Sequence, residues 1–173
     1  MGKGRVYHDK PFQYEDPYSG REVVRLTDYR GHSNHFYFTD PCWFNRSRSL
    51  LFTSDREGQG NLFRYDLDTY TITQVTDLKG DGRPRGCISP VNNANYYWWE
   101  GRLIELNLTT LAERVIWEVP PGFSPDNRAN PTADGKYVLY SSDLTRYANI
   151  YRVEVGNFDD LPLLTDDILT VRT

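Results

Sequence analysis

The sequence contains few of the residues that build disulfide frameworks or metal clusters. Its 173 residues include two cysteines, one methionine and three histidines. Two thiols, Cys42 and Cys87, do not make the framework of a disulfide-stapled secreted domain, so we expect a reducing compartment and hence a cytoplasmic location. The alternative is a secreted protein in its mature, trimmed form. No apolar run of about 18 residues is present, so we expect no membrane-spanning helix and no membrane partner.

The chain also lacks an excess of positive charge. It has 24 acidic and 20 basic residues, which gives a formal net charge of -4. General nucleic-acid binding needs a positive footprint, so we expect no nucleic-acid partner. Aromatic residues, in contrast, are plentiful at 14%, with 13 Tyr, 8 Phe and 4 Trp. Tyr and Phe favour pleated, half-buried surfaces, and the composition therefore indicates β-sheet.

Three short phrases recur along the chain with a period of about 45 residues. The phrase at 61–67, 102–108 and 149–155 alternates apolar and polar residues, which is the pattern of a half-buried strand. Turn compositions such as Ala133-Asp134-Gly135-Lys136 separate them. The phrases lie at 23–28, 72–77, 114–120 and 161–166; at 61–67, 102–108 and 149–155; and at 49–55, 95–99 and 137–143.

A unit of this length with four short strands is typical of one blade of a β-propeller. We therefore predict an all-β fold with about three four-stranded antiparallel blades, and we weigh a β-sandwich with chance similarity as the alternative. The predicted blades lie near 30–77, 81–120 and 124–166, with one extra N-terminal strand at 21–28 and a C-terminal stub at 167–173.

Three blades are too few for a closed ring, because closed propellers carry about 4–8 blades. The strand at 21–28 is typical of an outer strand that completes the last blade of a ring, and no partner blade for it is evident. We therefore expect an incomplete ring. The chain is a piece of a larger propeller, or copies of it associate to complete a ring, or it is an open arc with exposed edges.

Several segments are similar to one known family. They are Tyr14–Thr27, Gly31–Phe38, Leu50–Asp55, Gly86–Pro90 and Ile104–Leu111. These phrases resemble the oligogalacturonate lyases, pectin-degrading polysaccharide lyases with a β-propeller fold. The resemblance covers most of residues 10–120.

The resemblance implies a ring of about seven blades and β-elimination of short pectic oligogalacturonides. It also implies a catalytic histidine and a histidine-rich site for a divalent cation, usually manganese, on later blades. The only histidines here are His8, His32 and His35, so the metal cluster of the family has no counterpart in this chain. We identify no metal ligands, and we expect the activity to be impaired or absent in this chain alone. The alternative is a non-catalytic, TolB-like propeller that binds or assembles with partners.

The repeat alignment indicates which residues begin the inner strands at the mouth of the propeller channel. Asp40, Arg85 and Arg128 are equivalent, and so are Cys42, Cys87 and Asn130 two residues later. Arginine binds carboxylates through a planar fork, which suits a uronate. We therefore predict four substrate-binding residues, Arg83, Arg85, Arg128 and Asn130. The alternative is that these arginines pair with Asp40, Asp81 or Asp126 and hold adjacent blades together.

His32 and His35 are the candidates for a catalytic base. Removal of the proton beside a uronate carboxylate requires such a base, and imidazole is the commonest one. The two residues have an H-x-x-H spacing, but two histidines in a loop rarely make a metal site. A structural or surface role is the alternative for both.

Overall fold

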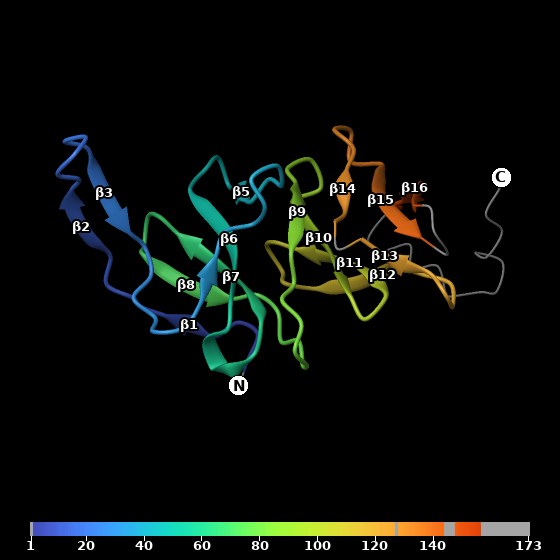
Figure 1. Ribbon diagram of the computed structural model, residues 1–173, viewed down its shortest axis with the longest axis horizontal. Helices are drawn as coiled ribbons and strands as arrows, with labels where there is room; N and C mark the ends of the chain where they lie inside the picture. The colour runs from blue at the N-terminus through green and yellow to red at the C-terminus, as the bar shows by residue number, and fades with distance from the viewer. Residues whose placement is uncertain (1, 127, 144–147, 157–173) are drawn as a thin grey trace.

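Three antiparallel sheets follow one another along the chain and lie side by side in an arc (Figure 1). The computed structural model describes residues 2–126, 128–143 and 148–156. The first sheet has the order β1-β8-β7-β6-β4, with β5 also paired to β6. Its strands are β4 (Ser33–Asn34), β5 (Trp43–Phe44), β6 (Ser49–Ser54), β7 (Asn61–Asp66), β8 (Thr71–Gln74) and, at the outer edge, β1 (Val6–Tyr7). A short 3-10 turn, η1 (Arg56–Gly58), follows β6.

The second and third sheets repeat this arrangement. The second has the order β12-β11-β10-β9, and in the third both β13 and β14 pair with β15, which also pairs with β16. These strands are β9 (Gly86–Ser89), β10 (Ala94–Trp99), β11 (Arg102–Asn107), β12 (Glu113–Glu118), β13 (Ser124–Pro125), β14 (Asn130–Pro131), β15 (Tyr137–Asp143) and β16 (Ala148–Glu154). The all-β fold is confirmed. The strand predicted at 161–166 and the stub at 167–173 lie outside the described residues.

Alternation along each strand builds two cores, one on each face of the second sheet. Leu51 and Leu62 of the first sheet pack with Tyr97 and Leu106 of the second. On the other face, Tyr96 and Trp98 pack with Val138, Tyr140 and Val153 of the third. Neighbouring residues of β10 therefore point to opposite cores, as a period of two requires. The aromatic excess of the sequence is largely packing between sheets.

The N-terminal residues add strands that the repeat did not predict. The predicted strand at 21–28 is present as β3 (Glu22–Arg25), and it pairs with β2 (Phe12–Glu15) in a two-stranded sheet at one end of the arc (Figure 1). β1 pairs with the outer edge of β8. The prediction that 21–28 completes the last blade of a ring stays a prediction. No helix among the described residues is long and apolar enough to cross a membrane.

Candidate functional site

The inner strands of the three sheets lie next to one another, as the repeat alignment predicts. The backbone N–H of Ile88, in β9, donates to the carbonyl of Pro41, just before β5, at 3.1 Å. Cys87 Sγ lies 3.9 Å from Asn130 Oδ1, which joins β9 to β14. Cys87 and Asn130 therefore lie in two adjacent strands, β9 and β14, and Cys42 lies just before β5.

Three predicted arginines stand at the entrances to these strands with their charges uncompensated by ion pairs. Arg83, Arg85 and Arg128 are exposed. Within the part of the chain that the structure describes, none of the three forms an ion pair with Asp40, Asp81, Asp126 or another carboxylate. Their predicted alternative role in holding adjacent blades by ion pairs is therefore wrong for the described residues.

Arg128 instead contacts an aromatic side chain of the first blade. Its guanidinium lies 4.2 Å from the centre of the Tyr37 ring, which is a cation–π distance. Tyr37 in turn packs on Phe38, with ring centres 4.4 Å apart. The segment that leads into β5 therefore meets the segment that leads into β14.

His35 lies in the same region but has both ring nitrogens engaged. Its Nδ1 lies 2.5 Å from the carbonyl oxygen of Phe36, and its Nε2 lies 3.0 Å from Cys42 Sγ. Burial raises the pKa of the Cys42 thiol. Burial, with the nearby negative charge of Asp40, raises the pKa of Cys87 to about 12. Both cysteines are free and buried, so they contribute neutral thiols to this side of the arc.

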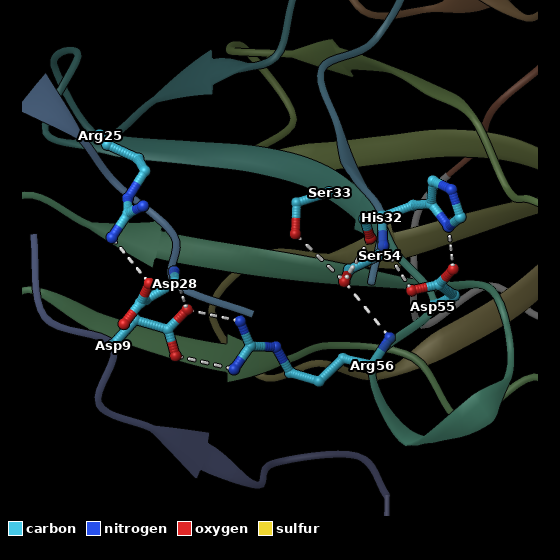
Figure 2. Close-up of polar contacts among 8 residues, drawn as sticks. All are labelled: Asp9, Arg25, Asp28, His32, Ser33, Ser54, Asp55 and Arg56. Atoms are coloured by element: carbon cyan, nitrogen blue, oxygen red, sulfur yellow. Dashed lines mark hydrogen bonds and ion pairs between the residues drawn. The ribbon is translucent and has the colours of Figure 1, made fainter. Parts of the chain in front are cut away.

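His32 makes a separate pair with Asp55 (Figure 2). Asp55 accepts the backbone N–H of His32 at 2.8 Å, and its second oxygen lies 2.6 Å from His32 Nδ1. These two hydrogen bonds hold the pKa of the Asp55 carboxyl below its usual range, and the positive charge of Arg83 adds to the effect. The side chain of His32 is 66% exposed, so its ring faces solvent. Asp55 orients an imidazole in the way that carboxylates orient catalytic histidines.

The structure thus divides the predicted residues into two groups. Arg128 contacts Tyr37 and Asn130 contacts Cys87, whereas His32 is hydrogen-bonded to Asp55 and Arg83 adds positive charge near the same carboxylate. Arg85 follows Pro84 in the chain. The carbonyl oxygen of Pro84 accepts a hydrogen bond from the hydroxyl of Thr53 at 2.6 Å, which holds this connection against the first sheet. The sequence analysis did not identify Tyr37 and Phe38. An adjacent pair of aromatic residues just before an inner strand is the sequence feature that could have indicated them.

Comparison with protein families and curated proteins points to one family. The oligogalacturonate lyase family matches residues 1–126. The oligogalacturonide lyase of Pectobacterium atrosepticum is 42% identical over 123 residues, and the oligogalacturonate lyase of Dickeya dadantii is 38% identical over 123 residues. Each match covers 69% of this chain and 31% of the relative. The chain therefore spans about a third of the length of these curated relatives.

Solved structures show the same relationship. An oligogalacturonate lyase in complex with manganese superposes with a TM-score of 0.76 at 29% identity, covering 82% of this chain and 38% of the other. An oligogalacturonate lyase from Vibrio parahaemolyticus gives 0.75 at 27% identity, covering 81% and 37%. TolB from Acinetobacter baumannii gives 0.60 at 22% identity, covering 85% and 35%, which shows a shared fold alone.

Proposed function

Because the chain belongs to the oligogalacturonate lyase family, we propose that it is a carboxylate-binding part of a lyase propeller that acts on pectic oligogalacturonides. The carrying observation is the set of three exposed arginines, Arg83, Arg85 and Arg128, which form no ion pair within the described residues. A guanidinium binds a carboxylate through two parallel N–H donors. An oligogalacturonide presents one carboxylate on every sugar residue, so several arginines along the inner strands match it.

β-Elimination requires a base that removes the proton beside the carboxylate, so that a carbon–carbon double bond forms as the bond to the glycosidic oxygen breaks. A third group or a water molecule protonates the departing oxygen. Of the two candidate bases, His32 is the better placed. Its exposed ring is oriented by Asp55, whereas both nitrogens of His35 are already hydrogen-bonded. A neighbouring Arg83 supplies positive charge of the kind that stabilises a developing enolate.

Manganese, which a solved relative contains, does not fit the residues present here. The described part of the chain holds no group of three or more His, Cys, Asp or Glu side chains that could bind a metal ion. His32 and His35 are each committed to a different partner, Asp55 and Cys42. We therefore assign substrate binding to this chain and expect its lyase activity alone to be impaired or absent. The proposed location is the cytoplasm, which suits two free thiols.

A TolB-like role in binding protein partners is the less favoured function, because the likeness to TolB is one of fold alone. The two functions differ in ligand. The first predicts binding of trigalacturonate, and the second predicts none.

Isothermal titration of the chain with trigalacturonate tests the proposal. Arg85→Gln and Arg83→Gln should each weaken binding about tenfold, which is the effect of a lost hydrogen bond to a charged group. Arg21→Gln is the matched control, because Arg21 is also exposed and forms no ion pair among the described residues. Absence of binding by the unaltered chain would overturn the proposal. Absorbance of the unsaturated product, measured with and without manganese, reports any residual lyase activity.

A further inference from the structure

We propose that Tyr37, Phe38 and Arg128 form a subsite that holds one uronate residue, with the sugar ring stacked on the aromatic pair and its carboxylate bound by Arg128. This inference rests on the proposed function and names residues that the repeat alignment did not predict. Of these three residues, only Arg128 is among the substrate-binding residues that the sequence predicts.

The two rings form an exposed platform. Phe38 is 81% exposed and Tyr37 is 38% exposed, and their centres lie 4.4 Å apart. Keeping such a pair in water is unfavourable, because a Phe side chain gains about 1.5–3 kcal/mol when it is fully buried. The backbone is held under the platform, since the N–H of Asp40 donates to the carbonyl of Tyr37 at 2.8 Å. The platform is therefore presented to solvent by an ordered turn.

A guanidinium without an ion pair among the described residues distinguishes this platform from the other stacked pair of exposed aromatic residues. The guanidinium of Arg128 lies 4.2 Å from the centre of the Tyr37 ring. Within the described residues it pairs with no carboxylate, so its N–H donors remain available to an anion. The nearby Asp40 is only 8% exposed and presents little negative charge to solvent. Phe12 and Tyr14 also stack, on the β2–β3 hairpin (Figure 1), and Arg25 lies 5.5 Å from the centre of the Phe12 ring. Arg25, however, is paired with Asp28 at 2.7 Å.

A uronate residue matches both halves of the subsite at once. Its ring carries an apolar C–H face that packs on an aromatic ring, and its carboxylate is attached directly to that ring. A neutral sugar would use the platform without the arginine, and a simple carboxylate would use the arginine without the platform. Because Arg128 comes from the third blade and Tyr37 from the segment before β5, a bound uronate would bridge two blades.

A binding experiment with the whole chain separates the contribution of the aromatic platform from that of Arg128. Trigalacturonate and its fully methyl-esterified form are titrated against the unaltered protein, Phe38→Ala and Arg128→Gln. Phe38→Ala should weaken binding of both ligands by roughly threefold to tenfold, the range measured for aromatic pairs. Arg128→Gln should weaken binding of the free acid about tenfold and leave binding of the ester unchanged. Tyr18→Ala is the control, because Tyr18 is 97% exposed in the hairpin turn.

A loss of stability should not account for weaker binding. Because Phe38 is exposed, Phe38→Ala should leave the midpoint of urea unfolding unchanged. If Phe38→Ala binds trigalacturonate as tightly as the unaltered chain does, the subsite is overturned while the arginine-based function stands. If Tyr18→Ala weakens binding as much as Phe38→Ala does, the subsite is overturned as well. If the unaltered chain binds no trigalacturonate, both proposals are overturned.

Discussion

The carboxylate of Asp9 accepts two hydrogen bonds from the guanidinium of Arg56, at 2.8 and 2.6 Å (Figure 2). The side chains of Arg56 and Asp9 are only 7% and 10% exposed. The guanidinium also lies 4.9 Å from the ring centres of both Tyr7 and Tyr29. This pair therefore fastens the N-terminal segment to the turn that follows β6.

Asp9→Asn should lower the free energy of unfolding by about 3 kcal/mol, because it leaves the guanidinium of Arg56 buried without its counter-charge. Urea unfolding followed by tryptophan fluorescence measures the change. Arg25→Gln is the control. It breaks the Arg25–Asp28 pair, whose side chains are 54% and 55% exposed, and should cost less than about 0.5 kcal/mol. Equal effects of the two substitutions would contradict the prediction.

The same pair predicts a dependence of stability on pH. The hydrogen bonds from Arg56 are the main reason that the pKa of Asp9 is lowered in the folded state. The unfolded chain therefore binds the proton more readily, and the stabilisation is complete above about pH 4 and is lost as pH falls through the lowered folded pKa. Urea unfolding between about pH 6 and pH 2 should show the native chain and Asp9→Asn converging in stability. A constant gap across this range would show that Asp9 is not the group responsible.

Both thiols should be unreactive in the native protein. Cys42 and Cys87 are 2% and 4% exposed, and burial raises the pKa of both, so almost no thiolate is available. Ellman's reagent near pH 8 should detect both thiols in guanidinium chloride and react slowly with either in buffer. Rapid reaction of either thiol in the folded protein would contradict this prediction.

The blades could be predicted from the sequence because each one repeats a local pattern. Alternating strands and turns recur with one period, and this period also aligns the inner strands. The predicted equivalence of Cys87 and Asn130 corresponds to a contact of 3.9 Å between β9 and β14. In contrast, β1 is only two residues long and forms by pairing with β8, more than sixty residues away. Nothing in so short a segment indicates a strand without its partner.

The candidate site was predicted less completely, for a related reason. An alignment of repeats identifies equivalent positions, but it cannot show which side chains reach from one blade to another. Arg128 was identified by its position, whereas its contact with Tyr37 depends on how two separate connections cross. The role of Asp55 in orienting His32 depends likewise on a contact between two segments that are 23 residues apart in the sequence.

Gly60 packs so closely against the connection that carries Arg83 that no larger side chain fits there. A Cβ at residue 60 would lie 2.3 Å from the carbonyl oxygen of Gly82, which is backbone and cannot rotate away. Gly60→Ala should therefore displace the connection that carries Arg83 and lower the free energy of unfolding by about 1–3 kcal/mol. Trigalacturonate binding should weaken as well. Gln59→Ala, at the exposed neighbouring residue, should change neither property, and unchanged stability of Gly60→Ala would contradict the packing argument.

The outer face of the third sheet should make the chain associate with other copies of itself. In β15 and β16, Val138, Tyr140 and Val153 pack toward the second sheet, so the alternate residues point away from it. On that outer face, Ile150 is 79% exposed and Leu139 is 37% exposed.

Sedimentation equilibrium should show a molar mass that rises with protein concentration, as expected for a sheet face with exposed apolar side chains. Ile150→Asp should reduce the association by placing a charge on that face. Val91→Asp is the control, because Val91 is 62% exposed in the turn between β9 and β10. A chain that stays monomeric at high concentration, or association that Ile150→Asp leaves unchanged, would show that this face does not join copies of the chain.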